Sequence, residues 1–139
     1  MGSLPHEDRQ GALELVFQQM AEVPVWPQLV PFSPEQMMVQ FNEGLPGLAQ
    51  KDNRTLFVPS DPGFEQELLE FYEEYLAASN GELPLEESRF CLTEDTGRTF
   101  FAFLERLDRQ QISPAAVKGQ ITGPFTLTAG LKDEKDQLA

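Results

Sequence analysis

Residues 116–127 read "AVKGQITGPFTL" and contain the clearest indication of the fold. The range Val117–Thr122 is rich in β-branched residues and carries little charge, which is typical of a buried strand. The Gly123-Pro124 pair then predicts a turn into a new helix over Phe125–Leu131, because proline is favoured in the first turn of a helix. A strand that leads into a helix in this way usually belongs to a parallel sheet. We therefore predict an α/β fold in which this strand lies in the interior of a sheet completed across a homodimer, or else that the protein aggregates when isolated.

Helical and extended patterns alternate through the rest of the chain. Asp8 is a candidate cap for an amphipathic helix over residues 8–20. Ser33, Pro34 and Gln36 match a capping box and predict a helix over 34–43. Further helices are expected over 61–78 and over 93–110, the latter capped by Thr93, and short strands over 23–29 and Thr55–Val58. Two or three strands alone would leave unprotected sheet edges, so we expect more sheet to be supplied from elsewhere.

The composition is that of a folded chain with an acidic surface. Of the 139 residues, 40% are hydrophobic and eleven are phenylalanine, which argues against disorder. The formal charge of −13 would repel a phosphate backbone, so nucleic acid is not an expected partner. Five glutamates lie in "FEQELLEFYEEYL" at residues 64–76, where they are expected to form the solvated face of a helix.

Cysteine content and hydropathy predict a cytoplasmic protein without a membrane span. Cys91 has no second cysteine with which to form an internal disulfide, and we expect it to be a small buried residue. The N-terminus lacks the pattern of a signal peptide, and no apolar run approaches the roughly 20 residues that span a bilayer.

Four motifs, in order, carry a resemblance to a known superfamily. They are "GSLPH" at 2–6, "WPQL" at 26–29, "VQFNEGLPG" at 39–47 and "VKGQITGPFTL" at 117–127. Together they resemble the N-terminal part of proteins in the superfamily of cobalamin-independent methionine synthase and uroporphyrinogen decarboxylase. The resemblance implies a (β/α)₈ TIM barrel, of which residues 1–139 would form a single incomplete domain with the first two or three β/α units and an inserted helical segment.

The same resemblance implies a function. The chain would be the N-terminal portion of a methionine-synthase-like methyltransferase, of the homocysteine S-methyltransferase class when the full barrel is present, and inactive by itself. Its substrate would be a small amino acid or thiol. An alternative is a non-catalytic module derived from the same fold, which self-associates as a homodimer to complete its sheet or acts as a regulatory domain. Whether the chain is an enzyme stays open at this point.

Candidate substrate-binding residues lie in the first motif. In the methionine synthase branch, a Gly-Ser pair similar to Gly2-Ser3 contacts the amino-acid substrate at the end of the first barrel strand. A glycine lets a ligand approach the backbone, and a serine hydroxyl can donate and accept hydrogen bonds. The alternative is a flexible terminus followed by a turn at proline. His6, the sole histidine, is a further candidate, or else a surface residue.

Three polar residues near predicted strand ends complete the candidate site. Gln28, Gln120 and Thr122 would face a pocket above the barrel, because barrel active sites lie at the C-terminal ends of the strands. Alternatively, Gln120 and Thr122 end a strand and satisfy the backbone groups of the turn. Trp26 and Phe125 are expected to be packing residues.

Zinc and the decarboxylase chemistry are both disfavoured for this chain. The zinc of methionine synthases is bound by a histidine, a glutamate and two cysteines from later parts of the barrel, and one histidine with one cysteine cannot form such a site. We therefore expect no cofactor within this chain. Decarboxylases of the superfamily use an arginine-rich segment after the first strand, where this sequence has only Arg9.

Overall fold

The computed structural model describes residues 3–51, 54–109 and 113–138. Within these residues it is a mixed α/β structure with small sheets. The chain divides into two compact units, one formed by residues 1–40 and 93–121 and the other by residues 41–92 and 122–139. None of the helices in the described ranges has the length and apolar character needed to cross a bilayer.

The first unit begins with a strand–helix–strand unit. Strand β1 (Ser3–Leu4) pairs in parallel with β2 (Gln28–Leu29), and helix α1 (Arg9–Gln19) connects them. The predicted cap is confirmed, since the Asp8 carboxylate accepts hydrogen bonds from the N–H groups of Gln10 and Gly11 at 3.1 and 2.9 Å. The parallel pairing of β1 with β2 confirms the prediction of parallel strands for these two segments.

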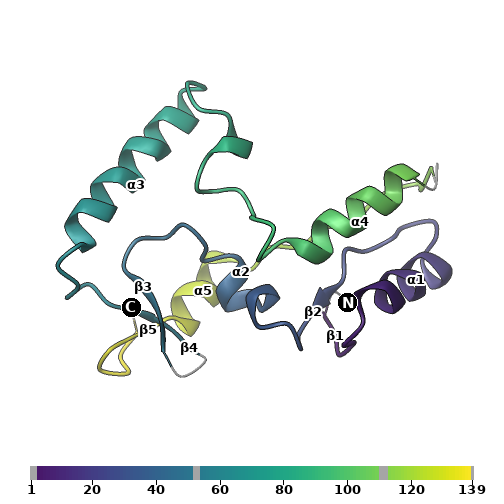
Figure 1. The fold of residues 1–139 in the computed structure, drawn as a ribbon, viewed down its shortest axis with the longest axis horizontal. Helices are drawn as coiled ribbons and strands as arrows, with labels where there is room; N and C mark the ends of the chain where they lie inside the picture. The colour runs from purple at the N-terminus through teal and green to yellow at the C-terminus, as the bar shows by residue number, and fades with distance from the viewer. Residues whose placement is uncertain (1–2, 52–53, 110–112, 139) are drawn as a thin grey trace. The chain divides into compact units, whose positions relative to one another are not determined.

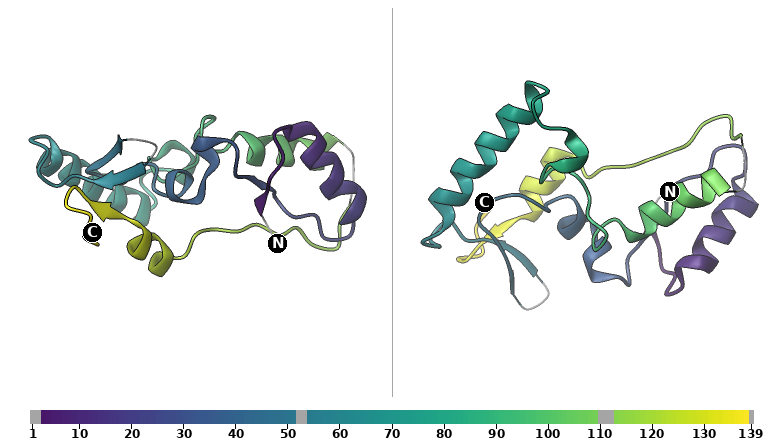
Figure 2. Two further views of the ribbon diagram at one scale, coloured as in Figure 1. Left: turned by 90° about the horizontal axis from the view of Figure 1, so that it is seen from below. Right: turned by 45° about the horizontal axis from the view of Figure 1, so that its top comes forward.

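The core of this unit forms between α1 and helix α4 (Arg98–Arg109), which lie side by side in Figures 1 and 2. The ring of Phe17 stacks on that of Phe103 with centroids 5.5 Å apart. Trp26 is buried and packs on Phe100 at 4.7 Å, so its predicted packing role is confirmed. The buried apolar residues are Ala12, Leu13, Val16, Phe17, Val25, Trp26, Leu29 and Phe103.

The segment after β2 differs from the prediction. In place of one helix over 34–43, it forms a 3₁₀ turn (η1, Ser33–Glu35) and the short helix α2 (Met37–Gln40). The predicted capping box is wrong, because the residue at the cap position is Phe32 and no side chain caps the turn. Gln36 instead donates through Nε2 to the carbonyl oxygen of Val30 at 3.2 Å.

The strand predicted over Val117–Thr122 is largely absent. In the described residues its sheet pairing consists of one parallel bridge between Val25 and Lys118, and the preceding strand is reduced to β2 because Pro24 and Pro27 have no N–H to donate. Ile121 is 78% exposed, so within a single chain the expectation that this stretch is buried inside a sheet is wrong. The helix that follows is confirmed as α5 (Pro124–Gly130), although Phe125 is exposed and does not pack.

The second unit has a three-stranded sheet in the order β3 (Leu48–Lys51), β4 (Arg54–Phe57) and β5 (Lys132–Asp133). Strands β3 and β4 are antiparallel, whereas β4 and β5 are parallel. Strand β4 confirms the prediction for Thr55–Val58 within one residue. Cys91 is half-buried rather than buried.

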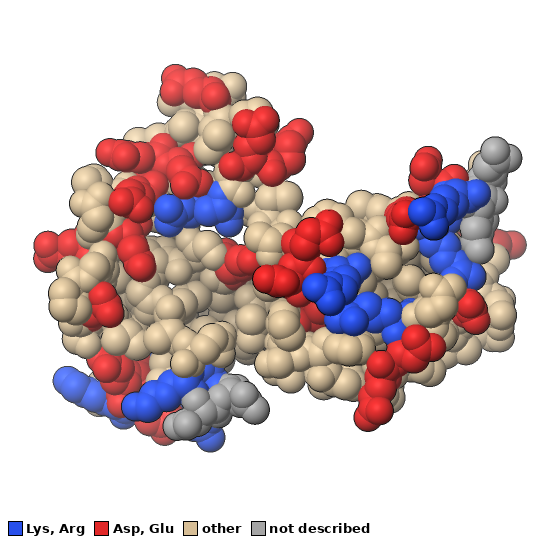
Figure 3. Space-filling view, in the orientation of Figure 1, with Lys and Arg blue, Asp and Glu red and all other residues tan. Residues whose placement is uncertain are grey.

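Helix α3 (Phe64–Ser79) carries five glutamates and no basic residue. It ends at Ser79 with Asn80 as its cap, and Gly81 follows with a φ of +75°, the left-handed conformation that commonly stops a helix. In Figure 3, acidic side chains gather over α3 and the segment that follows it. The predicted helix with a solvated acidic face is confirmed, and no residue of α3 is classed as buried. Helix α4 begins at Arg98, five residues later than predicted from Thr93, whose Oγ1 accepts from the Asp95 N–H at 3.3 Å.

Candidate functional site

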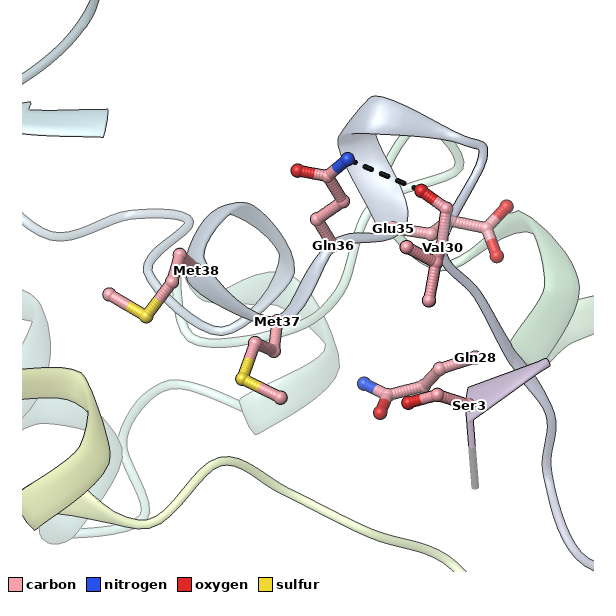
Figure 4. A pocket seen from close by; sticks show the side chains of 7 residues that line it. All are labelled: Ser3, Gln28, Val30, Glu35, Gln36, Met37 and Met38. Carbon is pink, nitrogen blue, oxygen red and sulfur yellow. Dashed lines mark hydrogen bonds between the residues drawn. The ribbon is translucent and has the colours of Figure 1, made fainter. Parts of the chain in front are cut away.

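A cavity of about 300 Å³ lies at the ends of the parallel strands in the first unit. Its wall is formed by Ser3 of β1, Gln28 of β2 and the turn that follows β2. Figure 4 shows the tips of the Ser3 and Gln28 side chains next to each other, with Met37 facing them. The lining residues are Ser3, Gln28, Val30, Glu35, Gln36, Met37 and Met38.

Strand register brings Ser3 and Gln28 together. The two residues are Cα partners in the parallel pairing of β1 with β2, so their side chains project on the same face of the sheet. Two of the six residues predicted as substrate-binding therefore line one cavity. A hydroxyl and a primary amide offer both donors and acceptors to a ligand.

The Gln28 amide is held by a second buried amide. Its Nε2 donates to Oε1 of Gln40 at 3.0 Å, and Gln40 is almost completely buried. Gln40 donates in turn to the backbone oxygen of Thr96. Because its N–H group is used in this way, Gln28 keeps its carbonyl oxygen as an acceptor toward a ligand.

A partly buried ion pair supports the turn that forms the cavity wall. Arg9 donates through Nε and Nη2 to Oε1 of Glu35, both at 3.0 Å, and Glu35 is 1% exposed. The Arg9 guanidinium also lies over the ring of Phe32, 3.7 Å from its centroid. In Figure 4 the Glu35 carboxylate points away from Met37 and Met38. The pair thus ties α1 to η1, and its charge is not directed at a ligand.

The other predicted site residues are placed elsewhere. Gly2 lies outside the described residues. His6 is half-buried and does not line this cavity, and Gln120 donates through Nε2 to the carbonyl oxygen of Trp26 at 3.1 Å. Thr122 belongs to the second unit. The structure brings Ser3 and Gln28 into one cavity and does not place His6 or Gln120 on its wall.

Sequence reasoning missed Glu35, Gln40 and the two methionines. They lie in "SPEQMMVQF" at 33–41, where the pattern was interpreted as a regular helix. The segment also contains the polar residues Ser33 and Gln36, which are exposed, so the sequence carried no signal that Glu35 and Gln40 are the buried ones.

The wall of the cavity is largely apolar. Val30, Met37 and Met38 supply flexible or branched hydrocarbon, and methionine sulfur is polarisable and adapts to the shape of a ligand. A cavity of this size with a few convergent polar groups is typical of a small-molecule site. The arrangement suits a small ligand that has a polar head and an apolar or sulfur-containing side chain.

The described residues do not fit a zinc ion. They contain no group of three or more histidine, cysteine, aspartate or glutamate side chains placed to hold a metal. We therefore derive no metal-dependent step for this chain.

Comparisons with known proteins were made for the whole chain. Neither the family models, nor the curated proteins, nor the solved structures gave a match to this sequence or fold.

Proposed function

We propose that this chain is the N-terminal part of a methionine-synthase-like methyltransferase, in which the cavity at Ser3 and Gln28 binds a small amino acid with a thioether or thiol side chain. The observation that carries the proposal is the convergence of Ser3 and Gln28 on one cavity. Both residues lie in motifs that resemble this superfamily. They are the first residues of the two-residue strands β1 and β2, and Val30 on the same wall follows the C-terminal end of β2, the end at which barrel enzymes bind their substrates.

The chemistry of the cavity supports an amino-acid ligand. The carbonyl oxygen of Gln28 is suited to accept a hydrogen bond from an α-ammonium group, and the Ser3 hydroxyl to donate one to a carboxylate. Met37 and Met38 then contact the side chain of the ligand. Methyl transfer itself requires further groups, so the chain alone is expected to bind the amino acid and to be inactive.

The partial (β/α)₈ barrel is part of the same proposal. Strands β1 and β2 with α1 between them have the connectivity of one β/α unit and the start of the next. The parallel bridge from Val25 to Lys118 is consistent with a third strand position. Residues 41–92 would then be the insertion.

Calorimetric titration tests the ligand class. L-methionine and L-homocysteine are expected to bind more tightly than L-norleucine, which lacks sulfur, and than L-alanine, which lacks the side chain. Ser3→Ala and Gln28→Leu should each weaken binding by about tenfold, the usual effect of losing one ligand hydrogen bond in a buried site. Gln18→Leu, an exposed position on α1, is the matched control and should bind like the parent.

Folding of each variant is checked by the emission of Trp26, the single tryptophan, which is buried in the same unit. No heat and no change in the NMR spectrum at millimolar methionine or homocysteine would contradict the proposal. The proposal would also be contradicted if the Gln28→Leu variant bound methionine or homocysteine as tightly as the parent chain.

A second candidate function is self-association. Val117 and Ile121 are exposed, and in the described residues their segment has one bridge, from Lys118 to Val25 ahead of β2. A homodimer that pairs these segments would cover them and complete the sheet. Size-exclusion chromatography with light scattering tests this candidate, and a monomer at all concentrations would rule it out.

A further inference from the structure

We propose that the outward face of α3 is a docking surface for a basic amphipathic helix of a partner protein. This surface lies in the second unit and is independent of the cavity described above. It consists of Leu69, Tyr72 and Leu76, with Glu65 and Glu73 beside them, and is called the α3 face below.

One side of α3 is already occupied within its own unit. Phe71 contacts Phe90 edge-to-face with ring centroids 5.3 Å apart. Oε2 of Glu67 accepts from the Gly47 N–H at 2.9 Å, and Oε2 of Glu74 accepts from the Arg89 N–H at 3.0 Å. These contacts fix which side of the helix faces the rest of the unit.

The α3 face lies on another side of the helix. Leu69, Tyr72 and Leu76 follow the i, i+3, i+7 spacing of one helical stripe, and they are 55%, 54% and 57% exposed. Single exposed apolar residues are ordinary, but a continuous stripe of three large ones on a helix is typical of a contact surface. Helix-in-groove and helix-on-helix recognition use anchors at this spacing.

The negative charge around α3 indicates which kind of partner the α3 face can bind. From Asp61 to Glu87 the sequence contains nine acidic residues and no lysine or arginine. Glu65 and Glu73 lie on the same side of α3 as the apolar stripe, and both are exposed. A partner that covers the stripe must therefore bring positive charge beside its own apolar residues.

The same charge argues against two other occupants. A second copy of the chain would place like charges opposite Glu65 and Glu73, which disfavours a symmetric contact. An anionic membrane surface would be repelled as well. A cationic amphipathic helix satisfies both the apolar stripe and the glutamates.

The test uses the full chain and two synthetic peptides labelled with fluorescein. Both peptides carry leucines at helical spacing, one with lysines and the other with glutamates beside them. Fluorescence anisotropy is expected to show binding of the lysine peptide that is at least about tenfold tighter than binding of the glutamate peptide, as charge complementarity predicts. Binding of the lysine peptide should weaken as salt is raised.

Variants locate the contact. The triple change Leu69→Ala, Tyr72→Ala and Leu76→Ala should weaken binding by about tenfold or more, since a few apolar anchors dominate such contacts. Alanine retains helix propensity, and circular dichroism checks that α3 persists. Glu65→Gln with Glu73→Gln should weaken binding about threefold and flatten its salt dependence. Phe125→Ala removes a large apolar residue that is even more exposed, from α5, and should leave binding unchanged.

Several results would overturn the proposal. They are absence of lysine-peptide binding, equal binding of the two peptides, and binding by the triple variant equal to that of the parent. Sedimentation that reveals a dimer lost only in the triple variant would assign the α3 face to a second copy instead.

Discussion

Replacement of Glu35 by glutamine is the sharpest test of the partly buried ion pair. The change keeps the shape of the side chain and removes its charge, which leaves Arg9 without its anionic partner. Glu35 is 1% exposed, whereas the Arg9 side chain is 28% exposed and can recover some hydration. The free energy of unfolding of the variant should therefore fall, but by less than when a fully buried ion pair is broken.

The magnitude follows from the two hydrogen bonds at 3.0 Å. A hydrogen bond to a charged group contributes about 1.5–3 kcal/mol, and breaking a fully buried pair costs about 3–5 kcal/mol. Because glutamine still offers one acceptor and Arg9 is partly hydrated, we expect a loss of about 2 kcal/mol. With the usual urea dependence of a small unit, this loss lowers the unfolding midpoint by about 1 M.

Urea denaturation followed by Trp26 emission measures the effect in the same unit. Glu22→Gln, at an exposed position, serves as the control and should not change the midpoint. If Glu35→Gln unfolds at the same urea concentration as the parent, the ion pair does not stabilise the turn that forms the cavity wall, and our account of that wall is wrong.

Three further predictions concern packing, pH and surface exposure. Phe103→Ala should lower the free energy of unfolding by about 3–5 kcal/mol and abolish the near-ultraviolet circular dichroism of the core. Leu104→Ala, on the exposed side of α4, should lower the free energy of unfolding far less. Equal losses in the two variants would contradict the assigned burial. The pKa of Glu74 is lowered, first by the hydrogen bond from the Arg89 backbone N–H and then by the Arg89 side chain, so this contact stabilises the fold above the usual glutamate pKa. The contribution should disappear as the pH falls through the lowered pKa, which hydrogen exchange of the Arg89 amide would detect, and Glu74→Gln should lack this acid step. Ile121→Lys should change the free energy of unfolding by less than about 0.5 kcal/mol, because Ile121 is exposed. The same variant should abolish any dimer seen by light scattering. A large destabilisation would show that residues 117–122 are buried within one chain.

Local sequence signals were reliable where the interactions that define an element lie within a few residues of each other. Asp8 caps α1 through N–H groups two and three residues away, and Gly81 follows the end of α3. The α/β class was predictable from the alternation of helical and extended patterns, whereas the pairing of β1 with β2 joins segments that are distant in the sequence. Ser3, put forward by the family resemblance, and Gln28, put forward by its place near a predicted strand end, line one cavity.

Features that depend on distant partners were decided by the tertiary structure. Glu35 is buried because Arg9, 26 residues away, neutralises it, and Gln40 because the Thr96 carbonyl oxygen, 56 residues away, accepts its hydrogen bond. These contacts break the expected helix into η1 and α2 and so form the cavity wall. The strand-like pattern of Val117–Thr122 specified an extended backbone, but pairing also requires N–H groups on the neighbour. The Trp26 N–H donates to the Lys118 carbonyl oxygen, whereas Pro24 and Pro27 on either side have no N–H to donate. A pattern along the chain determines the local conformation a segment prefers, whereas its burial and pairing are determined by the segments that pack against it.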